Sequence, residues 1–143
     1  MRWIVVCLLL VVAGCSVGKG QVELESFTTL GSARGLAGLA PAELGTPGAQ
    51  ELQRALERAK ISNLDEVRAA LTFAPSADRR GFAFVKPGCA EDGAELTVGG
   101  DALNVKLTGG ENVNCATANY FLAVFTVDRD SIPATPKLSK MPR

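Results

Sequence analysis

Cysteine is the residue type that offers distinctive chemistry in this chain, because the chain contains no histidine. The four cysteines are Cys7, Cys15, Cys89 and Cys115. Histidine is the commonest general base and the commonest transition-metal ligand, so both are missing here. Ser-His-Asp and Cys-His catalytic arrangements are therefore excluded. An enzyme would have to work with Asp, Glu, Lys, Arg, Ser or Tyr120 alone.

Cys15 ends a segment with a recognisable pattern. Arg2 supplies a single positive charge, and a short apolar run from Ile4 to Val12 follows it. This run is less than half of the roughly 20 residues that a membrane-spanning helix needs. Small residues then precede the cysteine, in the order Val12-Ala13-Gly14-Cys15. The segment resembles a bacterial lipoprotein signal peptide, and its last four residues resemble the lipobox that signal peptidase II reads.

The resemblance implies cleavage between Gly14 and Cys15, with acyl chains such as palmitate attached to Cys15. Each buried methylene contributes about 0.8 kcal/mol, so two or three chains give a lasting membrane anchor. Ser16 follows the cysteine, which is similar to the sorting pattern for an outer membrane. We therefore expect an extracytoplasmic protein, on the periplasmic face of an outer membrane or the outer face of a cell membrane. Residues 1–14 would be the signal peptide, and residues 15–20 the lipidated cysteine and a tether.

The two remaining cysteines, Cys89 and Cys115, form an even pair in the oxidising compartment that the lipoprotein resemblance implies. We expect them to form a disulfide. Closing a loop of roughly 27 residues would stabilise the fold by about 3.5 kcal/mol in the chain-entropy estimate. A redox-active thiol pair is a rival interpretation, but it would favour a C-x-x-C spacing. A metal site is another, but it would lack histidine partners, and we expect no metal or cofactor.

Alternation of apolar and polar residues predicts five strands, over 21–27, 81–86, 95–98, 102–107 and 119–127. In the first strand, Val22 and Leu24 are expected to face the core, and Glu23 and Glu25 the solvent. The last strand is apolar on both faces, which predicts a central position in the sheet. The strands over 95–98 and 102–107 are joined by Gly99-Gly100-Asp101, and this pattern is typical of a β-hairpin.

Two helices are predicted between the first and second strands. Thr46-Pro47 is typical of a helix start, and an apolar stripe runs to Ala59. A second helix begins near Ser62-Asn63 and must end before Pro75. We therefore expect a single α+β domain over residues 21–130, with a small antiparallel sheet of about five strands, two short helices packed on it and one disulfide. Residues 131–143 contain three prolines and are expected to be a flexible tail.

The balance of charges excludes some classes of function. Fifteen basic residues match fifteen acidic ones, and no basic stripe favours nucleic acid as a partner. Four acidic residues are candidates for a calcium site near the hairpin, but they do not follow the spacing of a calcium-binding loop. These residues are Glu91, Asp92, Glu95 and Asp101.

These observations favour a lipid-anchored cell-envelope protein. We expect a non-catalytic binding or accessory module, which meets the membrane through Cys15 and an unknown protein, cell-wall or small-molecule partner through its folded domain. The loops beside the cysteine pair, 86–93 and 108–114, are the first places to look for a binding site. A protease-inhibitor-like module that presents the disulfide-bounded loop is an alternative. A small hydrolase that uses carboxylates is a further one.

Overall fold

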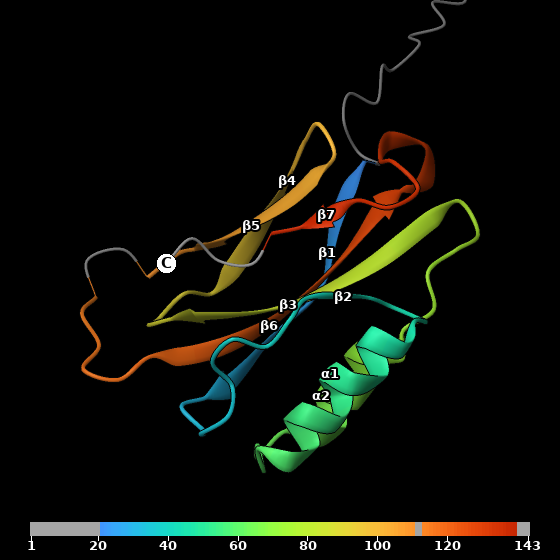
Figure 1. The fold of residues 1–143 in the computed structure, drawn as a ribbon. Helices are drawn as coiled ribbons and strands as arrows, with labels where there is room; N and C mark the ends of the chain where they lie inside the picture. Colours follow the sequence, from blue (N-terminus) through green and yellow to red (C-terminus); the bar gives the residue numbers. More distant parts are fainter. Residues whose placement is uncertain (1–20, 111–112, 140–143) are drawn as a thin grey trace, which may run out of the picture.

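The computed structural model describes residues 21–110 and 113–139. Cys15, Gly14 and the rest of the segment that resembles a signal peptide lie outside these residues. The described chain forms three layers, in which a central sheet lies between two helices on one face and a second sheet on the other (Figure 1). Among the described residues, no helix has the length and hydrophobicity needed to cross a bilayer.

The central sheet has four antiparallel strands in the order β1-β6-β3-β2. Their bounds are β1 (Val22–Gly31), β6 (Asn119–Asp128), β3 (Arg79–Gly88) and β2 (Ala42–Glu43). The prediction of a central last strand is confirmed, because β6 pairs with β1 on one side and β3 on the other. Its residues from Phe121 to Val127 are all buried, since both faces of the sheet are covered.

The second sheet contains β4 (Gly93–Gly99), β5 (Ala102–Thr108) and β7 (Lys137–Leu138). The predicted hairpin is present as β4 and β5, but it does not extend the central sheet. It forms a separate layer over the face that carries Phe82, Phe84 and Phe125. The expectation of one sheet of about five strands is therefore corrected to seven strands in two sheets among the described residues, within the predicted α+β class.

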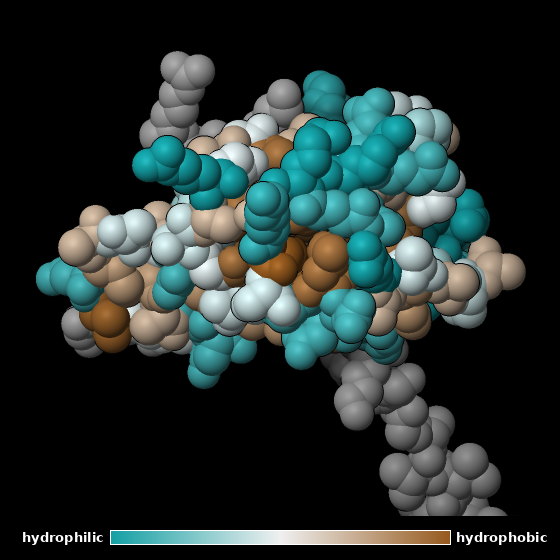
Figure 2. All heavy atoms as spheres, turned by 90° about the horizontal axis from the view of Figure 1, so that it is seen from below, coloured by the Kyte–Doolittle hydropathy of each residue, from teal (hydrophilic) through white to brown (hydrophobic). Residues whose placement is uncertain are grey.

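Two helices, α1 (Pro47–Arg58) and α2 (Leu64–Leu71), cover the opposite face, as predicted. Leu56 and Val67 of these helices are fully buried against Leu122 and Val124 of the sheet. Polar residues lie on the outer sides of the helices. Figure 2 shows the face seen from below, where hydrophilic side chains surround a central group of hydrophobic residues.

The residues that precede the helices bond to neighbouring segments and do not cap the helices through their side chains. Thr46 occupies the N-cap position of α1, as predicted, but its hydroxyl donates to the carbonyl of Glu43 at 2.6 Å. Asn63 precedes α2, and its amide nitrogen donates to the carbonyl of Thr29 at 2.8 Å. The two bonds link the start of α1 to β2 and the start of α2 to β1.

Strand β1 contains a bulge that the sequence pattern did not reveal. The pairing with β6 shifts between Leu24 and Ser26, so that Glu25 has no direct partner in the register. A bulge of this kind reverses which face the following residues occupy. Phe27, after the bulge, therefore packs on the same side as Val22, against the second sheet. Leu24, before the bulge and expected to face the core, is 42% exposed.

The segment after β6 packs against the domain over residues 131–139, where we expected a flexible tail. A short 3-10 helix spans Arg129–Ser131, and Ile132 after it is buried. Lys137–Leu138 then pairs in parallel with the start of β5. The prolines fit this path because each lies outside the short paired stretch. Residues 140–143 lie outside the described part of the chain.

Candidate binding pocket

The disulfide between Cys89 and Cys115 is present, with 5.5 Å between the two Cα atoms. Cys89 directly follows β3, and Cys115 lies shortly before β6. The bridge therefore joins the ends of two neighbouring strands and encloses the β4–β5 hairpin, as predicted. Asn119 reinforces this junction, because its side-chain amide donates to the carbonyl of Cys89 at 3.0 Å.

The outer edge of β3 is only partly covered near this junction. Strand β2 pairs with β3 at just two positions, Ala42 with Ala83 and Glu43 with Phe82. The amide of Leu44 extends this contact by donating to the carbonyl of Gly81 at 2.8 Å. β3 continues to Gly88, so its last residues have no strand beside them on this edge within the described chain.

The backbone of Val85 faces this open edge. The β3–β6 ladder contains no register shift, so backbone groups alternate regularly along β3. The carbonyl of Gly81 points away from β6, toward Leu44. Val85 lies four residues further on and therefore directs its N–H and C=O to the same side. Pro87 follows on that side without an N–H, as is usual for proline at a sheet edge.

A cavity of about 290 Å³, which we call the edge pocket, lies at this open edge. Its walls come from the loop between β1 and β2 (residues 36–39 and Pro41), from residues 84–87 of β3, from Tyr120 and from Ser139. The loop is held in place by Leu36, which is only 1% exposed. Gly35 and Gly38 have φ angles of 90° and 74°, a left-handed conformation that glycine adopts readily.

Lys86 is the one charged residue among the described residues that line the edge pocket. Its side chain is 6% exposed, and it lies beside Phe121 in the β3–β6 register. Within the described chain, no hydrogen bond or ion pair joins Lys86 to another side chain. Burial lowers the pKa of its amine below the usual lysine range. The pocket thus combines apolar walls with one unpartnered cation.

The loops expected to carry the binding site contribute only in part. Lys86 and Pro87, at the start of the 86–93 range, line the pocket. The remainder of that loop is tied to its neighbours, since the amide of Cys89 donates to Glu91 and that of Asp92 to the carbonyl of Thr108 at 3.1 Å. The described residues of the 108–114 range do not line the pocket.

One signal in the sequence pointed to Lys86 and was missed. Phe82 and Phe84 alternate on the face of β3 that packs against the second sheet. Lys86 continues this alternation, so its spacing places a lysine on a buried face. The loop wall, Tyr120 and Ser139 carried no comparable signal, because they come from segments brought together only by the tertiary fold.

The acidic residues considered for calcium do not gather at one place. Asp101 pairs with Lys137 at 3.1 Å on the surface, and strand β4 separates it from Glu91 in sequence. Among the described residues, no group of three or more histidine, cysteine, aspartate or glutamate side chains is arranged to hold a metal ion. The part of the edge pocket that the structure describes is lined by no carboxylate.

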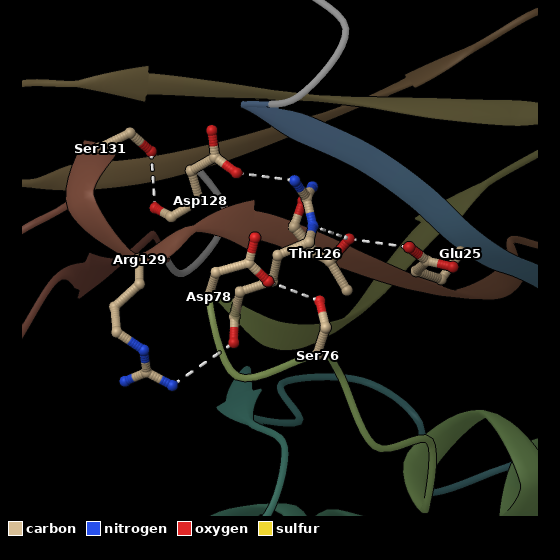
Figure 3. A network of polar contacts seen from close by, with 8 residues as sticks. Glu25, Ser76, Asp78, Thr126, Asp128, Arg129 and Ser131 are labelled. Carbon is tan, nitrogen blue, oxygen red and sulfur yellow. Dashed lines mark hydrogen bonds and ion pairs between the residues drawn. The ribbon is translucent and has the colours of Figure 1, made fainter.

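A second polar cluster lies toward the other end of the central sheet, and its groups bond to each other. Arg79 pairs with Asp128 at 2.8 Å and donates to the hydroxyl of Thr126 at 3.1 Å. That hydroxyl donates in turn to Glu25 at 2.8 Å, as Figure 3 shows. Because these groups bond to each other, the cluster joins β1, β6 and β3.

No family model, curated protein or solved structure matches this chain. The function must therefore follow from the residues and their geometry. Of the features described above, the edge pocket is the one that combines a cavity, an open strand edge and a buried cation without a partner.

Proposed function

We propose that this chain is a lipid-anchored protein of the cell envelope that binds a small ligand in the edge pocket and catalyses no reaction. The observation that carries the binding part is Lys86, a buried cation that lines the cavity and has no partner among the described residues. Small-molecule sites typically have mostly apolar walls with a few polar groups that orient the ligand. The edge pocket has this character.

The scaffold around the pocket supports a binding role. Strands β3 and β6 supply Lys86 and Tyr120, and the disulfide joins the adjoining ends of both strands. A ligand would therefore meet groups that the fold has already ordered. Ordered groups lose little entropy on binding, and this favours affinity.

The edge pocket lies at the end of β1 that is farther from the residues where the proposed tether would join it. Val22, close to the tether, pairs with Val127, whereas Gly31 pairs with Tyr120 of the pocket. A strand of 10 residues spans about 33 Å. The attachment at Cys15 would thus hold the pocket well away from the point of anchoring. This arrangement favours a ligand taken from the aqueous space of the envelope.

The anchor is tested by the intact mass of protein extracted from membranes. We expect a chain that begins at Cys15, carries added acyl mass and moves to the soluble fraction in Cys15→Ala. Cys7→Ala is the matched control, because Cys7 would be removed with the signal peptide and its loss should leave the mass unchanged. Trp3 is the one tryptophan of the chain, so the processed protein should lack tryptophan fluorescence. A soluble wild-type chain without acyl mass would refute the anchor.

The binding role is tested by NMR on the purified chain, whatever the state of Cys15, with the methyl groups of Leu36, Leu39 and Val85 as reporters. A screen of small molecules should yield compounds that shift these reporters and leave those of Val67, beneath the helices, unchanged. Compounds that shift no reporter, or that act only outside the pocket, would contradict the proposed site. This result is independent of the fate of Cys15.

A further inference from the structure

We propose that the edge pocket takes a small amphiphile with a single acidic group, which pairs with Lys86 on the second-sheet side of β3 while its apolar part crosses the open edge to Leu36, Leu39 and Val85 on the helix side. This inference rests on the proposed binding function and adds the chemical class of the ligand. It follows from the charge, the walls and the open strand edge of the pocket.

Lys86 has no counter-charge among the described residues. An ammonium group that is withdrawn from water without a counter-charge destabilises the fold. Nζ of Lys86 is nevertheless not fully sealed from solvent. Within the described chain, the one side-chain polar atom that is both sealed and unbonded is Oδ1 of Asn63. The amine therefore keeps an approach from outside. A bound anion would supply the counter-charge, and the pair is stronger in apolar surroundings than in water.

The direction of the burial effect on Lys86 agrees with this geometry. Loss of hydration is the cause that lowers the pKa of the amine, and no nearby carboxylate opposes it. An acidic group placed at Nζ would favour the charged amine and raise its pKa again. The ligand is thus expected to carry the negative charge that the described part of the chain does not place there.

The walls define the rest of the ligand. Leu36, Leu39, Pro41 and Val85 present hydrocarbon to the cavity. A volume of about 290 Å³ lies at the small end of the range for ligand pockets, so it suits a short chain or ring and excludes a folded partner. A purely ionic ligand would leave these apolar walls unused. An amphiphile satisfies both the walls and the cation.

The open edge of β3 offers a further contact for the acidic group. The N–H of Val85 faces this edge, and β2 ends its pairing at Ala83. An acid has two or more oxygens, so it is able to accept from Val85 as well as from Lys86. A neutral head group such as an alcohol lacks the charge that Lys86 requires.

The test uses octanoate, octyl phosphate and octan-1-ol as probes. Their affinities are measured by titration calorimetry on the same purified chain that is used for NMR. Octanoate or octyl phosphate should bind at least about tenfold more tightly than octan-1-ol, since charge-assisted bonds are the strong ones. The acid that binds more tightly then shows whether the pocket prefers a carboxylate or a phosphate. Lys86→Met should reduce this preference to near equality. Lys106→Met, on the exposed side of β5, should leave it intact.

The outcomes separate the ligand class from the binding role. Equal affinity for all three probes, unaffected by Lys86→Met, would overturn the acidic amphiphile. A different result is a neutral compound that shifts the methyl resonances of Leu36 and Val85 while neither acid shifts them. That result would overturn the acidic amphiphile but support the proposed binding function. Urea unfolding of Lys86→Met shows whether the variant is folded, and Lys86→Gln provides a second variant of similar reach.

Discussion

Arg80 meets Glu43 through two parallel hydrogen bonds, from Nε to Oε1 at 2.8 Å and from Nη2 to Oε2 at 2.8 Å. The guanidinium is buried and also donates to the carbonyls of Pro133 and Ala134 at 3.0 and 3.1 Å. A single side chain of β3 thus holds both the short strand β2 and the segment that leads to β7. The planar fork of arginine suits this role, and lysine does not provide it.

Glu43→Gln should destabilise the protein by about 2 to 3 kcal/mol, because it leaves a buried guanidinium without its counter-charge. Glu57→Gln is the matched control, since Glu57 pairs with Arg68 in an exposed setting with side chains 32% and 48% exposed. Exposed ion pairs contribute little to stability, so Glu57→Gln should cost far less than Glu43→Gln. Urea unfolding measures both values. Equal losses of unfolding free energy in the two variants would show that burial of Arg80 does not strengthen its pair with Glu43.

Arg80→Met should release the segment between Ile132 and Ser139 before the whole domain unfolds. The variant removes both bonds to the carbonyls of Pro133 and Ala134. Hydrogen exchange should then accelerate at the amides of Lys137 and Ser139, which donate to Asp101 and Leu103. The amides of β6 serve as the internal control. Unchanged exchange at Lys137 would mean that β7 holds without Arg80.

Cys89→Ala combined with Cys115→Ala should lower the free energy of unfolding by about 3.5 kcal/mol, because the unfolded chain loses a constraint on a loop of roughly 27 residues. Denaturant unfolding of the oxidised and reduced wild-type protein gives an independent measure. The reduced protein should match the double variant. If reduction leaves stability unaltered, the bridge does not constrain the unfolded chain in the expected way.

Lys86 should make the stability of the protein rise with pH. Its pKa is lowered in the folded state, while the unfolded value is about 10.4. Between these two values the unfolded state binds the proton and the folded state does not, so the free energy of unfolding increases as the pH rises through this window. Below the window both states are protonated, and the folded state carries the full cost of the buried charge.

Lys86→Met should abolish this rise and be more stable than the wild-type protein at neutral pH. Urea unfolding between about pH 7 and about pH 10 covers the relevant range. Lys137→Met, at a side chain that is 77% exposed, should keep the rise. A slope in Lys86→Met equal to that of the wild type would assign the effect to other groups.

Gly110→Ala should be more destabilising than Gly100→Ala. Both glycines have left-handed φ angles, of 65° and 60°, so alanine costs about 1 to 2 kcal/mol at either position. At Gly110 a Cβ atom would also lie 2.6 Å from the backbone carbon of Ala90, whereas at Gly100 it meets nothing within 4 Å. Thermal unfolding of the two variants measures the difference. Similar values would show that the loop moves aside without cost.

The long elements could be predicted from sequence because each carries its own periodic signal. The strand from Asn119 is apolar on both faces and is indeed central, and Thr46-Pro47 does begin α1. β2 and β7 are two residues long, which is too short for any period to appear. The bulge at Glu25 also escaped prediction, since a single inserted residue leaves no trace in the local pattern.

The separate layer formed by the hairpin could not be predicted from the same kind of signal. Alternation shows that β4 and β5 each have one apolar face, but it does not say which surface that face meets. The decision depends on the aromatic face of β3 and β6, which comes from distant parts of the chain. The edge pocket has the same origin, because loop 36–41, β3 and Ser139 meet only after the sheets have packed.

The pairing of β1 with β6 also has a consequence for how the chain becomes folded. Val22 lies opposite Val127, so the first and the last long strands are neighbours in the central sheet. Contacts between residues so far apart in sequence form slowly and late. The central sheet therefore remains incomplete until β6 has been synthesised. For a protein exported as we propose, this order would keep the chain unfolded, and so able to thread through a narrow channel, until β6 emerges.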